Sequence, residues 1–486
     1  MIYSFEPFGN GNLIHTDILI KDGNFSIDIC GIYESLISSL REKLKLSLEN
    51  SGYELPKKRI LLNLSPSDLL KRSSNHDLAL ALTIQNVPQK DILVLGELNL
   101  DGTLRPAKSV FVAMQMAIEN GIKHAIIAKG SDTPPKEINA VYVGNIREAV
   151  DAMENIEISQ DLKEYSTENS DGVENSDEVI FSELEENESL DDIFLSDYSE
   201  DTALAVIATV AGKHNLLLWG GMNCGKSFVA TEMKKIIPLP TSEEFQGIER
   251  LYSLSGFHGL CSKPFTPFRM PHQTATIEGI FGGGTNLRCG EISLAHNGVL
   301  FLDEASEFRT SVLQMLRVPL ENGQITLSRA GRTATYPSKF QLVLTVNRCP
   351  CGSDKICFCS PNAVKQYWQK VTNPLLDSFP IRIEVNKPSE NEKSKLTIRR
   401  ARELVANAIK IQRERGFYNG QVKFSYGKVA ESVNYDKLLP SNWTVKAKSN
   451  ALSVARTLAD MESYEDIDHD HINKACELRQ KVPSEY

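Results

Sequence analysis

One octapeptide constrains the fold of this chain more than any other feature of its sequence. Residues 220–227 read GGMNCGKS and match the pattern G-x-x-x-x-G-K-[ST], in which glycines allow backbone N–H groups to turn towards phosphate oxygens. The apolar run LLLW precedes the octapeptide, and the helical sequence SFVATEMKKII follows it. Because a phosphate-binding loop connects a buried strand to the N-terminus of a helix, we expect a nucleotide-binding α/β core here.

The residues of this loop are the candidate nucleotide ligands. They are Gly220, Gly221, Met222, Asn223, Cys224, Gly225, Lys226 and Ser227. The Lys226 ammonium would neutralise the β- and γ-phosphates of ATP, and the Ser227 hydroxyl would hold Mg²⁺ at the helix N-terminus.

Two later strands offer the remaining groups of a nucleotide site. The sequence GVLFLDE ends an apolar strand in Asp303, placed to bind the Mg²⁺ shell, and Glu304, placed to polarise an attacking water. The strand FQLVLTVN ends in Asn347, whose amide would position that water near the γ-phosphate. An Asp-Glu pair after a strand is otherwise typical of a helix N-cap, but the upstream loop favours the nucleotide site.

The rest of the pattern predicts several domains. At 486 residues two or three domains are expected. Residues 1–153 predict a compact α/β domain, in which DILIKDGNFSIDIC alternates like two paired strands around an Asp-Gly turn. In residues 201–388 apolar strands alternate with helices, which predicts a parallel, doubly wound sheet. From residue 389 to 486 the pattern is wholly helical.

An acidic segment separates the two α/β patterns. Residues 151–200 hold 18 Asp and Glu against the single Lys163, a local net charge of −17 within a total of −10, so the remaining chain is net positive by seven. So polar a segment cannot bury enough apolar surface to offset its ordering entropy, and residues 154–200 are expected to form a flexible linker. Because one segment carries the acidity, the net charge does not exclude a nucleic-acid partner.

No sequence feature predicts secretion or membrane insertion. The first 20 residues lack a basic region followed by an apolar core. Apolar runs such as ALAVIATVAG are far shorter than the ~20 residues of a membrane span. We therefore expect a cytoplasmic protein that makes no membrane contact.

Four cysteines are grouped directly after the third strand of the predicted core. Cys349, Cys351, Cys357 and Cys359 have the spacing C-x-C-x5-C-x-C. Four thiolates within eleven residues suit a closed, tetrahedral, structural Zn²⁺ site. Two disulfides or free thiols are the alternative, which a reducing cytoplasm disfavours, and the tight C-x-C pairs would crowd an iron–sulfur cubane.

Long stretches of the sequence resemble one known family. FRMPHQTATIEGIFGGGTNLRCGEISLAHNGVLFLDEASEF and LENGQITLSRAGRTATYPSKFQLVLTVNRCPCG are similar to the magnesium-chelatase-like AAA+ ATPases of the ComM/YifB family. The resemblance continues through residues 389–486, which would form a helical lid. In residues 1–153, LENSGYELPKKRILLNLSPSDL and LGELNLDGTLRP resemble a Lon-protease-like domain. The resemblance implies a hexameric, ATP- and Mg²⁺-dependent ring acting on DNA, in branch migration or competence-related processing.

The Lon-like segment departs from Lon proteases at the catalytic positions. Those enzymes use a Ser–Lys dyad, and the matching residues here are Asn75 and Phe111. Neither side chain can act as nucleophile or base, so peptidase activity is not expected.

The ATPase segment also departs from its family. The family loop reads GPPGTGKT, and an Arg in its LLDR motif reaches the γ-phosphate of a neighbouring subunit, where this chain has Ser378. The family's nucleotide-sensing Arg, in its SARA motif, aligns with Lys446, which retains the charge but lacks the planar fork. Because an arginine finger contributes several orders of magnitude in rate, hydrolysis is expected to be slow or to depend on another subunit. Arg382, close in sequence to Ser378, is the alternative cation.

One basic segment is a candidate for contact with DNA. LRVPLENGQITLSRAGRTATYPSKF contains Arg317, Arg329, Arg332 and Lys339 around a predicted hairpin. In related motors such loops contact a phosphate backbone, but a charged hairpin is equally consistent with a solvated surface or a subunit interface.

Three functional hypotheses therefore remain. The first is an oligomeric, DNA-acting ATPase. The second is a hydrolysis-impaired scaffold that uses ATP binding to drive assembly or recruit a partner. The third, a true magnesium chelatase subunit, is disfavoured by the Lon-like segment and the cysteine group.

Overall fold

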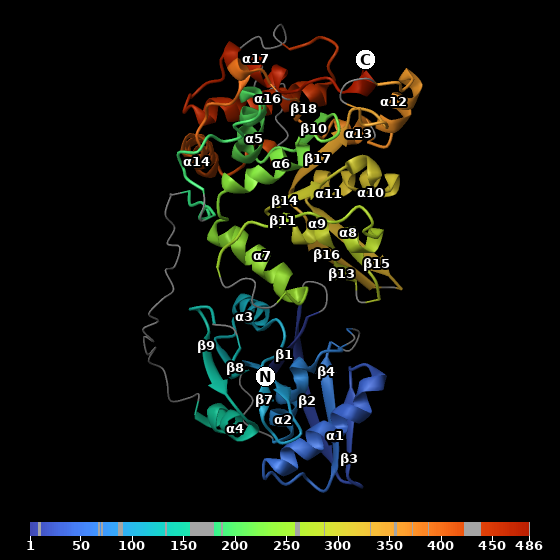
Figure 1. Cartoon of the computed structure of the whole chain (residues 1–486). Helices are drawn as coiled ribbons and strands as arrows, with labels where there is room; N and C mark the ends of the chain where they lie inside the picture. The colour runs from blue at the N-terminus through green and yellow to red at the C-terminus, as the bar shows by residue number, and fades with distance from the viewer. Residues whose placement is uncertain are drawn as a thin grey trace. The chain divides into compact units, whose positions relative to one another are not determined.

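The chain folds into two compact units (Figure 1). The computed structural model describes residues 1–7, 11–66, 69, 71–85, 91–131, 134–155, 179–185, 188–257, 263–285, 287–330, 332–353, 357–371, 373–386, 388–421 and 439–485. The first unit comprises residues 1–172, 249–262 and 286–288, and the second comprises residues 173–248, 263–285 and 289–486. The helices after residue 389 therefore belong to the same unit as the phosphate loop.

The first unit is built on a seven-stranded mixed sheet. Its strand order is β3 (Ser26–Cys30), β4 (Arg59–Ser65), β2 (Asn12–Lys21), β1 (Ile2–Glu6), β5 (Ile92–Leu95), β8 (His124–Ala128) and β9 (Asn139–Val143), with a small separate ribbon of β6 (Glu97–Leu98) and β7 (Leu104–Arg105). Its helices are α1 (Glu34–Asn50), α2 (Asp77–Ile84), α3 (Val110–Glu119) and α4 (Ile146–Asn155), and the 3₁₀ turn η1 (Ser74–His76) precedes α2. Alternate strand residues face two separate apolar clusters, one shared with α1, α2 and α4 and the other with α3. The predicted compact α/β fold is thus confirmed for this unit.

The predicted pairing of its second and third strands is wrong. β2 and β3 flank the Asp-Gly turn as expected, but β4 lies between them, antiparallel to β2 and parallel to β3. The inward residues of β4, Ile60, Leu62 and Leu64, are fully buried. A strand this apolar is more stable in the sheet interior than at an edge, so it displaces the local hairpin pairing.

The second unit is built on a five-stranded parallel sheet. The order is β11 (Phe268–Arg269), β14 (Val299–Leu302), β17 (Gln341–Asn347), β10 (Leu216–Gly220) and β18 (Ile381–Val385), and every neighbouring pair is parallel. The non-consecutive strand order and the buried, apolar strands confirm the predicted doubly wound core. We call the end where β10, β14 and β17 finish the carboxyl edge, and the opposite end the amino edge.

Helices cover both faces of this sheet. One face packs against α5 (Glu200–Gly212), α6 (Lys226–Glu232), α14 (Ile398–Arg415), α16 (Val445–Met461) and α17 (His469–Glu477). The other face packs against α8 (Ile277–Phe281), α9 (Glu291–Leu294), α10 (Thr310–Met315), α12 (Pro361–Trp368) and α13 (Asn373–Leu376). Two further elements are shared between the units: α7 (Ser242–Leu254) from residue 249 and β13 (Arg288–Cys289) at residue 288 belong in part to the first unit. The remaining elements of the second unit are α11 (Arg317–Asn322), β12 (Gly282–Gly283), which pairs with β13, the hairpin of β15 (Gln324–Arg329) and β16 (Arg332–Pro337), and the short 3₁₀ turns η2 (Met233–Lys235), η3 (Ala305–Glu307), η4 (Glu390–Glu392), η5 (Asn419–Gln421) and η7 (Pro483–Glu485).

The C-terminal part of the predicted linker is folded. Residues 156–178 and 186–187 lie outside the described residues. Phe194 and Leu195 are buried in the core that contains α5, and the N–H of Phe194 donates to the carbonyl of Leu396 at 2.7 Å. Ser199 caps α5 by accepting from the N–H of Thr202. The second unit therefore begins before residue 200, because the few apolar residues of this acidic segment pack into its core.

Within the described residues, no helix is both long enough and apolar enough to cross a lipid bilayer.

Candidate nucleotide site

The phosphate loop connects β10 to α6 and depends on two left-handed residues. Asn223 has φ +61° and Gly225 has φ +90°. Asparagine is among the few non-glycine residues that adopt this conformation readily. A Cβ atom on Gly225 would lie 1.8 Å from the hydroxyl oxygen of Tyr198, so only glycine fits there. The unusual residues of the octapeptide are therefore compatible with the backbone conformation of a phosphate-binding loop.

The two polar residues that end the loop lie beneath it. Lys226 is 7% exposed, and its Nζ donates to the carbonyl of Gly221 within the loop. The Ser227 hydroxyl donates to the carboxylate of Asp303, with Oγ 2.7 Å from Oδ1 and 2.9 Å from Oδ2. The first-turn N–H groups of α6 have no partner within the helix, so they are available to phosphate oxygens.

Strand register brings the candidate acids to this loop. β17 pairs with β10 so that Asn347 lies beside Gly220, and with β14 so that Leu344 lies beside Leu302. Asp303 directly follows β14, and the carboxyl ends of parallel strands meet at one edge. All the sequence-predicted nucleotide residues except Lys446 therefore gather at the carboxyl edge.

Two further residues hold the acids in place. The Thr345 hydroxyl donates to Asp303 Oδ1 at 2.6 Å and accepts from the backbone N–H of Glu304 at 2.7 Å. Gln273 Nε2 donates to Glu304 Oε2 at 2.7 Å. Glu304 itself has φ +49°, a strained backbone conformation of the kind that clusters at functional sites. Sequence reasoning did not select Thr345 or Gln273; the one signal was a hydroxyl residue inside the otherwise apolar strand LVLTV.

This donor set fits Mg²⁺ and a nucleoside triphosphate. Mg²⁺ prefers hard oxygen ligands supplied by a hydroxyl and one or two carboxylates together with phosphates. The Ser227 hydroxyl and the Asp303 carboxylate already lie within hydrogen-bonding distance of each other. Lys226 supplies the cation for the phosphate chain, and Glu304 supplies a carboxylate at the same edge.

Ser378 and Lys446 lie at the opposite edge of the sheet. Ser378 comes three residues before β18, and its carbonyl accepts from Nδ2 of Asn215, which directly precedes β10, at 2.9 Å. Lys446, in the first turn of α16, places its Nζ 3.4 Å from Ser378 Oγ. Each strand spans roughly 16 Å at about 3.3 Å per residue. Lys446 is therefore not brought together with the phosphate loop of its own chain.

Arg382, the alternative cation near Ser378, is buried within its own unit. Its side chain is 3% exposed. Its Nη1 lies 2.9 Å from a carboxylate oxygen of Glu485, and its Nη2 donates to the carbonyl of Leu376 at 2.8 Å. A guanidinium buried with these partners is committed to the fold of its own unit.

The four clustered cysteines come together in space. We call the described residues 348–353 and 357–360 the cysteine loop. The sulfur atoms of Cys349, Cys351, Cys357 and Cys359 all lie within 4.8 Å of one another. Neighbouring sulfurs are separated by 3.2 to 3.8 Å, far longer than a disulfide bond and close to the ~3.8 Å edge of a Zn–S₄ tetrahedron with bonds of about 2.3 Å.

Two of these thiols differ in acidity. Burial raises the pKa of the Cys349 thiol to about 12. A hydrogen bond from the backbone N–H of Ser353 lowers the pKa of Cys351 to about 7. A metal that bound here would displace the remaining protons, because thiolates are the ligands. The four sulfurs thus fit a closed metal site.

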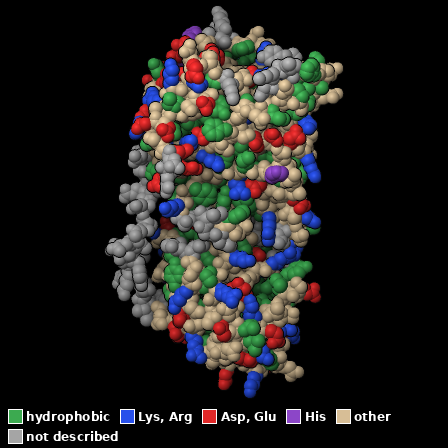
Figure 2. All heavy atoms as spheres, viewed as in Figure 1, with side chains coloured by type: hydrophobic (Ala, Val, Ile, Leu, Met, Phe, Trp, Pro, Cys, Tyr) green, Lys and Arg blue, Asp and Glu red, His purple; other side chains and the backbone are tan. Residues whose placement is uncertain are grey.

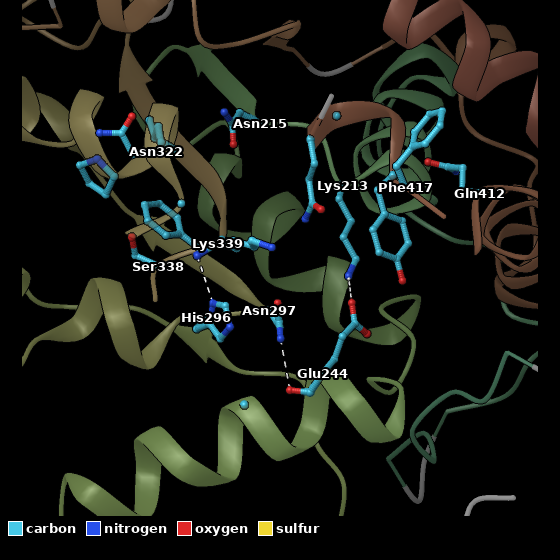
Figure 3. A pocket seen from close by; sticks show the side chains of 18 of the residues that line it. Lys213, Asn215, Glu244, His296, Asn297, Asn322, Ser338, Lys339, Gln412 and Phe417 are labelled. Carbon is cyan, nitrogen blue, oxygen red and sulfur yellow. Dashed lines mark hydrogen bonds and ion pairs between the residues drawn. The ribbon is translucent and has the colours of Figure 1, made fainter. Parts of the chain in front are cut away.

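A cavity lies at the opposite edge of the same sheet. A pocket of about 750 Å³ is lined by residues of the amino edge, including Lys213, Asn215 and Asn297, and by residues near the end of α14. Figure 3 shows its ion pair between Lys213 and Glu244 and the hydrogen bond from the backbone N–H of Lys339 to His296. Burial lowers the pKa of His296 to about 4. Because the phosphate loop lies at the carboxyl edge, this pocket is not the nucleotide site.

The basic segment forms the predicted hairpin, but its cations are separated. β15 and β16 pair antiparallel, with Arg329 opposite Arg332 at the tip. Arg317 forms an ion pair with Glu321 on α11, and Lys339 lies at the pocket. Acidic and basic side chains are interspersed on the face shown in Figure 2. The hairpin tip is therefore the place where two cations of the segment are adjacent.

The first unit lacks a nucleophile at the position that matches Lon proteases. Asn75 is buried, and its side-chain amide clamps the backbone of Lys108 through two hydrogen bonds, Nδ2 to the carbonyl at 2.8 Å and N–H to Oδ1 at 2.9 Å. Phe111 lies in the first turn of α3. A clamped amide is a structural element and supplies neither a nucleophile nor a base.

Comparisons with known proteins find relatives over almost the whole chain. The family model "Magnesium chelatase, subunit ChlI" matches residues 195–393, and the model "Subunit ChlI of Mg-chelatase" matches residues 16–131. The chain is 29% identical to the uncharacterized protein YifB of Escherichia coli, over 97% of this chain and 94% of that protein. It is 30% identical to an uncharacterized protein of Mycobacterium tuberculosis, over 78% and 75%. It is 29% identical to the competence protein ComM of Haemophilus influenzae, over 99% and 97%.

Proposed function

Because this chain belongs to the magnesium-chelatase-like AAA+ family that contains YifB and ComM, we propose that it is an oligomeric, Mg²⁺-dependent ATPase that acts on DNA. The single observation that carries the proposal is the group of Lys226, Ser227, Asp303 and Glu304 at the end of one parallel sheet, fixed by hydrogen bonds. We further propose that residues 1–153 form a Lon-like domain without peptidase activity and that residues 389–486 act as a lid.

Each residue of the site has a proposed role. Lys226 binds the β- and γ-phosphates, and Ser227 and Asp303 hold the magnesium ion, which supplies charge neutralisation when bound. Glu304 orients and polarises the attacking water, with Gln273 fixing its carboxylate. Asn347, beside Gly220 in the register, positions the same water. The zinc ion proposed for the four cysteines has no part in this chemistry, because four sulfurs leave no open position.

The missing γ-phosphate cation comes from a neighbouring subunit. Ser378 and Lys446 are adjacent to each other and lie at the amino edge, where neither can reach the phosphate loop of its own chain. We propose a head-to-tail ring in which the amino edge of one copy faces the carboxyl edge of the next. We therefore assign Lys446 as the residue that supplies positive charge in trans, in a ring that family resemblance makes hexameric.

A second function is supported by one specific observation. Ser378 carries no charge, and the neighbouring Arg382 is buried and committed to Glu485. If Lys446 cannot replace the arginine, the protein is an ATP-binding scaffold in which nucleotide controls assembly or partner recruitment. Turnover separates the two functions, because both bind ATP.

The DNA claim is tested by ATP-dependent binding. Glu304→Gln should trap the ATP-bound ring, and its affinity for single-stranded, double-stranded and branched DNA is measured by fluorescence anisotropy with and without Mg–ATP. The proposal predicts binding that requires ATP and falls when Arg329 and Arg332 at the hairpin tip are changed to Ala. If the variant binds no DNA either with or without Mg–ATP, the proposed action on DNA is contradicted, and the ATP-binding scaffold is the function that remains.

A further inference from the structure

The phosphate loop and the cysteine loop are joined through their backbones. The N–H of Met222, in the middle of the phosphate loop, donates to the carbonyl of Gly352 at 2.8 Å. The N–H of Arg348, where the cysteine loop begins, donates to the carbonyl of Gly220 at 2.8 Å. The loop that carries the four thiols therefore contacts both the first and the third residue of the nucleotide-binding octapeptide.

The contact at Gly352 is close and leaves little freedom. Gly352 is buried and has φ +65°. A Cβ atom on this residue would lie 2.7 Å from the terminal methyl carbon of Met222 and 3.2 Å from its Cβ. The side chain of Met222 thus packs directly over the Gly352 backbone, in addition to the hydrogen bond.

Gly352 belongs to the turn that presents two of the thiols. Its own N–H donates to the carbonyl of Cys349 at 3.1 Å, which closes a turn over Cys349 to Gly352. Cys351 lies within this turn. A metal bound to all four sulfurs would fix the turn relative to the rest of the loop, because each ligand is held at a defined bond length and angle. The carbonyl that receives the Met222 N–H would be fixed with it.

A fixed phosphate loop binds nucleotide more tightly than a mobile one. Ordering a loop at the moment of binding costs free energy, and a loop already held in its bound conformation avoids that cost. Met222 lies before α6, whose first-turn N–H groups are the expected phosphate donors. Its bond to Gly352 therefore orients the loop without occupying those donors.

We propose that a divalent, thiolate-binding metal held by Cys349, Cys351, Cys357 and Cys359 sets the affinity of the phosphate loop for ATP through the hydrogen bond from Met222 to Gly352. The inference rests on the proposed function only in requiring that ATP binds at this loop. Because coupling between two ligands is reciprocal, bound ATP raises the affinity for the metal by the same factor.

The chain offers a selective substitution. Met222→Pro removes the N–H donor, because proline has none, and leaves all four cysteines and Lys226 in place. Met222→Leu is the matched control, since it keeps the N–H and a side chain of similar volume. Cys357→Ser removes one metal ligand without altering the phosphate loop.

The experiment measures the dissociation constant of a fluorescent Mg–ATP analogue for the full chain, zinc-loaded and zinc-stripped. We expect the zinc-loaded protein to bind about two- to tenfold more tightly, the range that one hydrogen bond supports. Met222→Leu should keep this ratio, and Met222→Pro and Cys357→Ser should bring it close to one. A chromogenic zinc chelator should show tighter zinc binding by the wild type when a non-hydrolysable ATP analogue is present.

The outcomes that overturn the inference are distinct from failure of the proposed function. Equal nucleotide affinity with and without zinc in the wild type overturns the inference alone, as does a ratio that Met222→Pro leaves unchanged. No nucleotide binding by the wild type in either form contradicts the proposed function as well. Circular dichroism would show whether stripping zinc unfolds the chain. If it does, the inference is tested on the zinc-loaded variants alone. Met222→Pro must then bind nucleotide about two- to tenfold more weakly than Met222→Leu, and equal affinities overturn the inference.

Discussion

The ammonium nitrogen of Lys446 lies 3.4 Å from the hydroxyl oxygen of Ser378. These are the two positions that the family resemblance aligns with arginines, and they are 68 residues apart in sequence. The N-terminal part of α16 is held there by a second contact, because Asn450 Nδ2 donates to the carbonyl of Asp377 at 2.9 Å. The Lys446 cation thus lies beside the uncharged Ser378.

Lys446→Ala should lower ATP turnover by at least about tenfold, because a cation that faces the γ-phosphate from a neighbouring subunit stabilises the transition state. It should leave the affinity for ATP nearly unchanged, since Lys446 lies at the edge opposite its own phosphate loop. Steady-state hydrolysis and equilibrium nucleotide binding check both parts. Lys446→Arg is the control and should retain or raise the rate.

A mixing experiment tests the action in trans. Lys226→Ala and Lys446→Ala subunits are each impaired alone, but an equal mixture contains interfaces with one intact loop and one intact lysine. Turnover should therefore recover partly on mixing. Two variants that fail to complement would show that Lys446 does not act across an interface.

Thr345→Val should reduce turnover about ten- to a hundredfold, because it removes both the hydroxyl that donates to Asp303 and the acceptor for the N–H of Glu304. A buried donor left without its partner costs about 1–3 kcal/mol. Thr345→Ser retains the hydroxyl and should retain most of the rate. A Thr345→Val enzyme with wild-type turnover would show that the two acids need no such support.

The stability of the second unit should fall as the pH drops below 6.5. His214 is fully buried, with Nε2 2.7 Å from Thr457 Oγ1, and burial lowers its pKa to about 3. The folded state therefore binds fewer protons than the unfolded state between about pH 3 and 6.5, and its stability decreases by about 1.4 kcal/mol per pH unit through that window.

Denaturant unfolding of the second unit between pH 7 and 5 checks this dependence. His214→Gln keeps a hydrogen-bonding side chain that does not titrate, so its pH profile should be flatter. His296, whose pKa is lowered to about 4, contributes to the same window and leaves a residual slope. Identical slopes in the wild type and His214→Gln would contradict the account.

The first unit should lose stability at a lower pH. Burial raises the pKa of Glu6, but its hydrogen bond and ion pair with His76 and its bonds from Ser73 outweigh burial and lower the pKa below its ordinary value. The Glu6 carboxylate therefore stabilises the fold above pH ~4.5 and loses this effect as the pH falls through the lower, folded-state pKa. Glu6→Gln should remove that acid-dependent loss, while Asp22→Asn, at an exposed ion pair with Lys58, should leave it unchanged.

The residues at the carboxyl edge of the nucleotide site could be predicted from the sequence, because each of them belongs to a local sequence pattern. A loop with glycines at fixed spacing, an apolar strand before it and an acid after the next strand must converge at one sheet edge. The loop tolerates its unusual residues because the two positions with a left-handed backbone are occupied by Gly225 and Asn223, which adopt it readily. Lys226, Ser227 and Asp303 follow from the same local rules.

The parts that the sequence did not predict depend on distant partners. β4 inserts between β2 and β3 from about thirty residues away, so local alternation could not exclude a hairpin. Phe194 and Leu195 lie in an acidic segment but are buried by helices from the other end of the unit. The contact between Met222 and Gly352 joins two motifs that appear unrelated along the chain.

The most direct test of the central claim is steady-state ATP hydrolysis by the purified protein, with and without single- and double-stranded DNA. Lys226→Ala removes the phosphate cation, and Glu304→Gln removes the carboxylate that polarises water. The account predicts Mg²⁺-dependent turnover that rises with DNA and is lost in both variants. If the protein binds ATP but its turnover is no higher than that of the two variants, whatever DNA is added, the proposed DNA-acting ATPase is contradicted. A nucleotide-controlled scaffold would then be the function that remains.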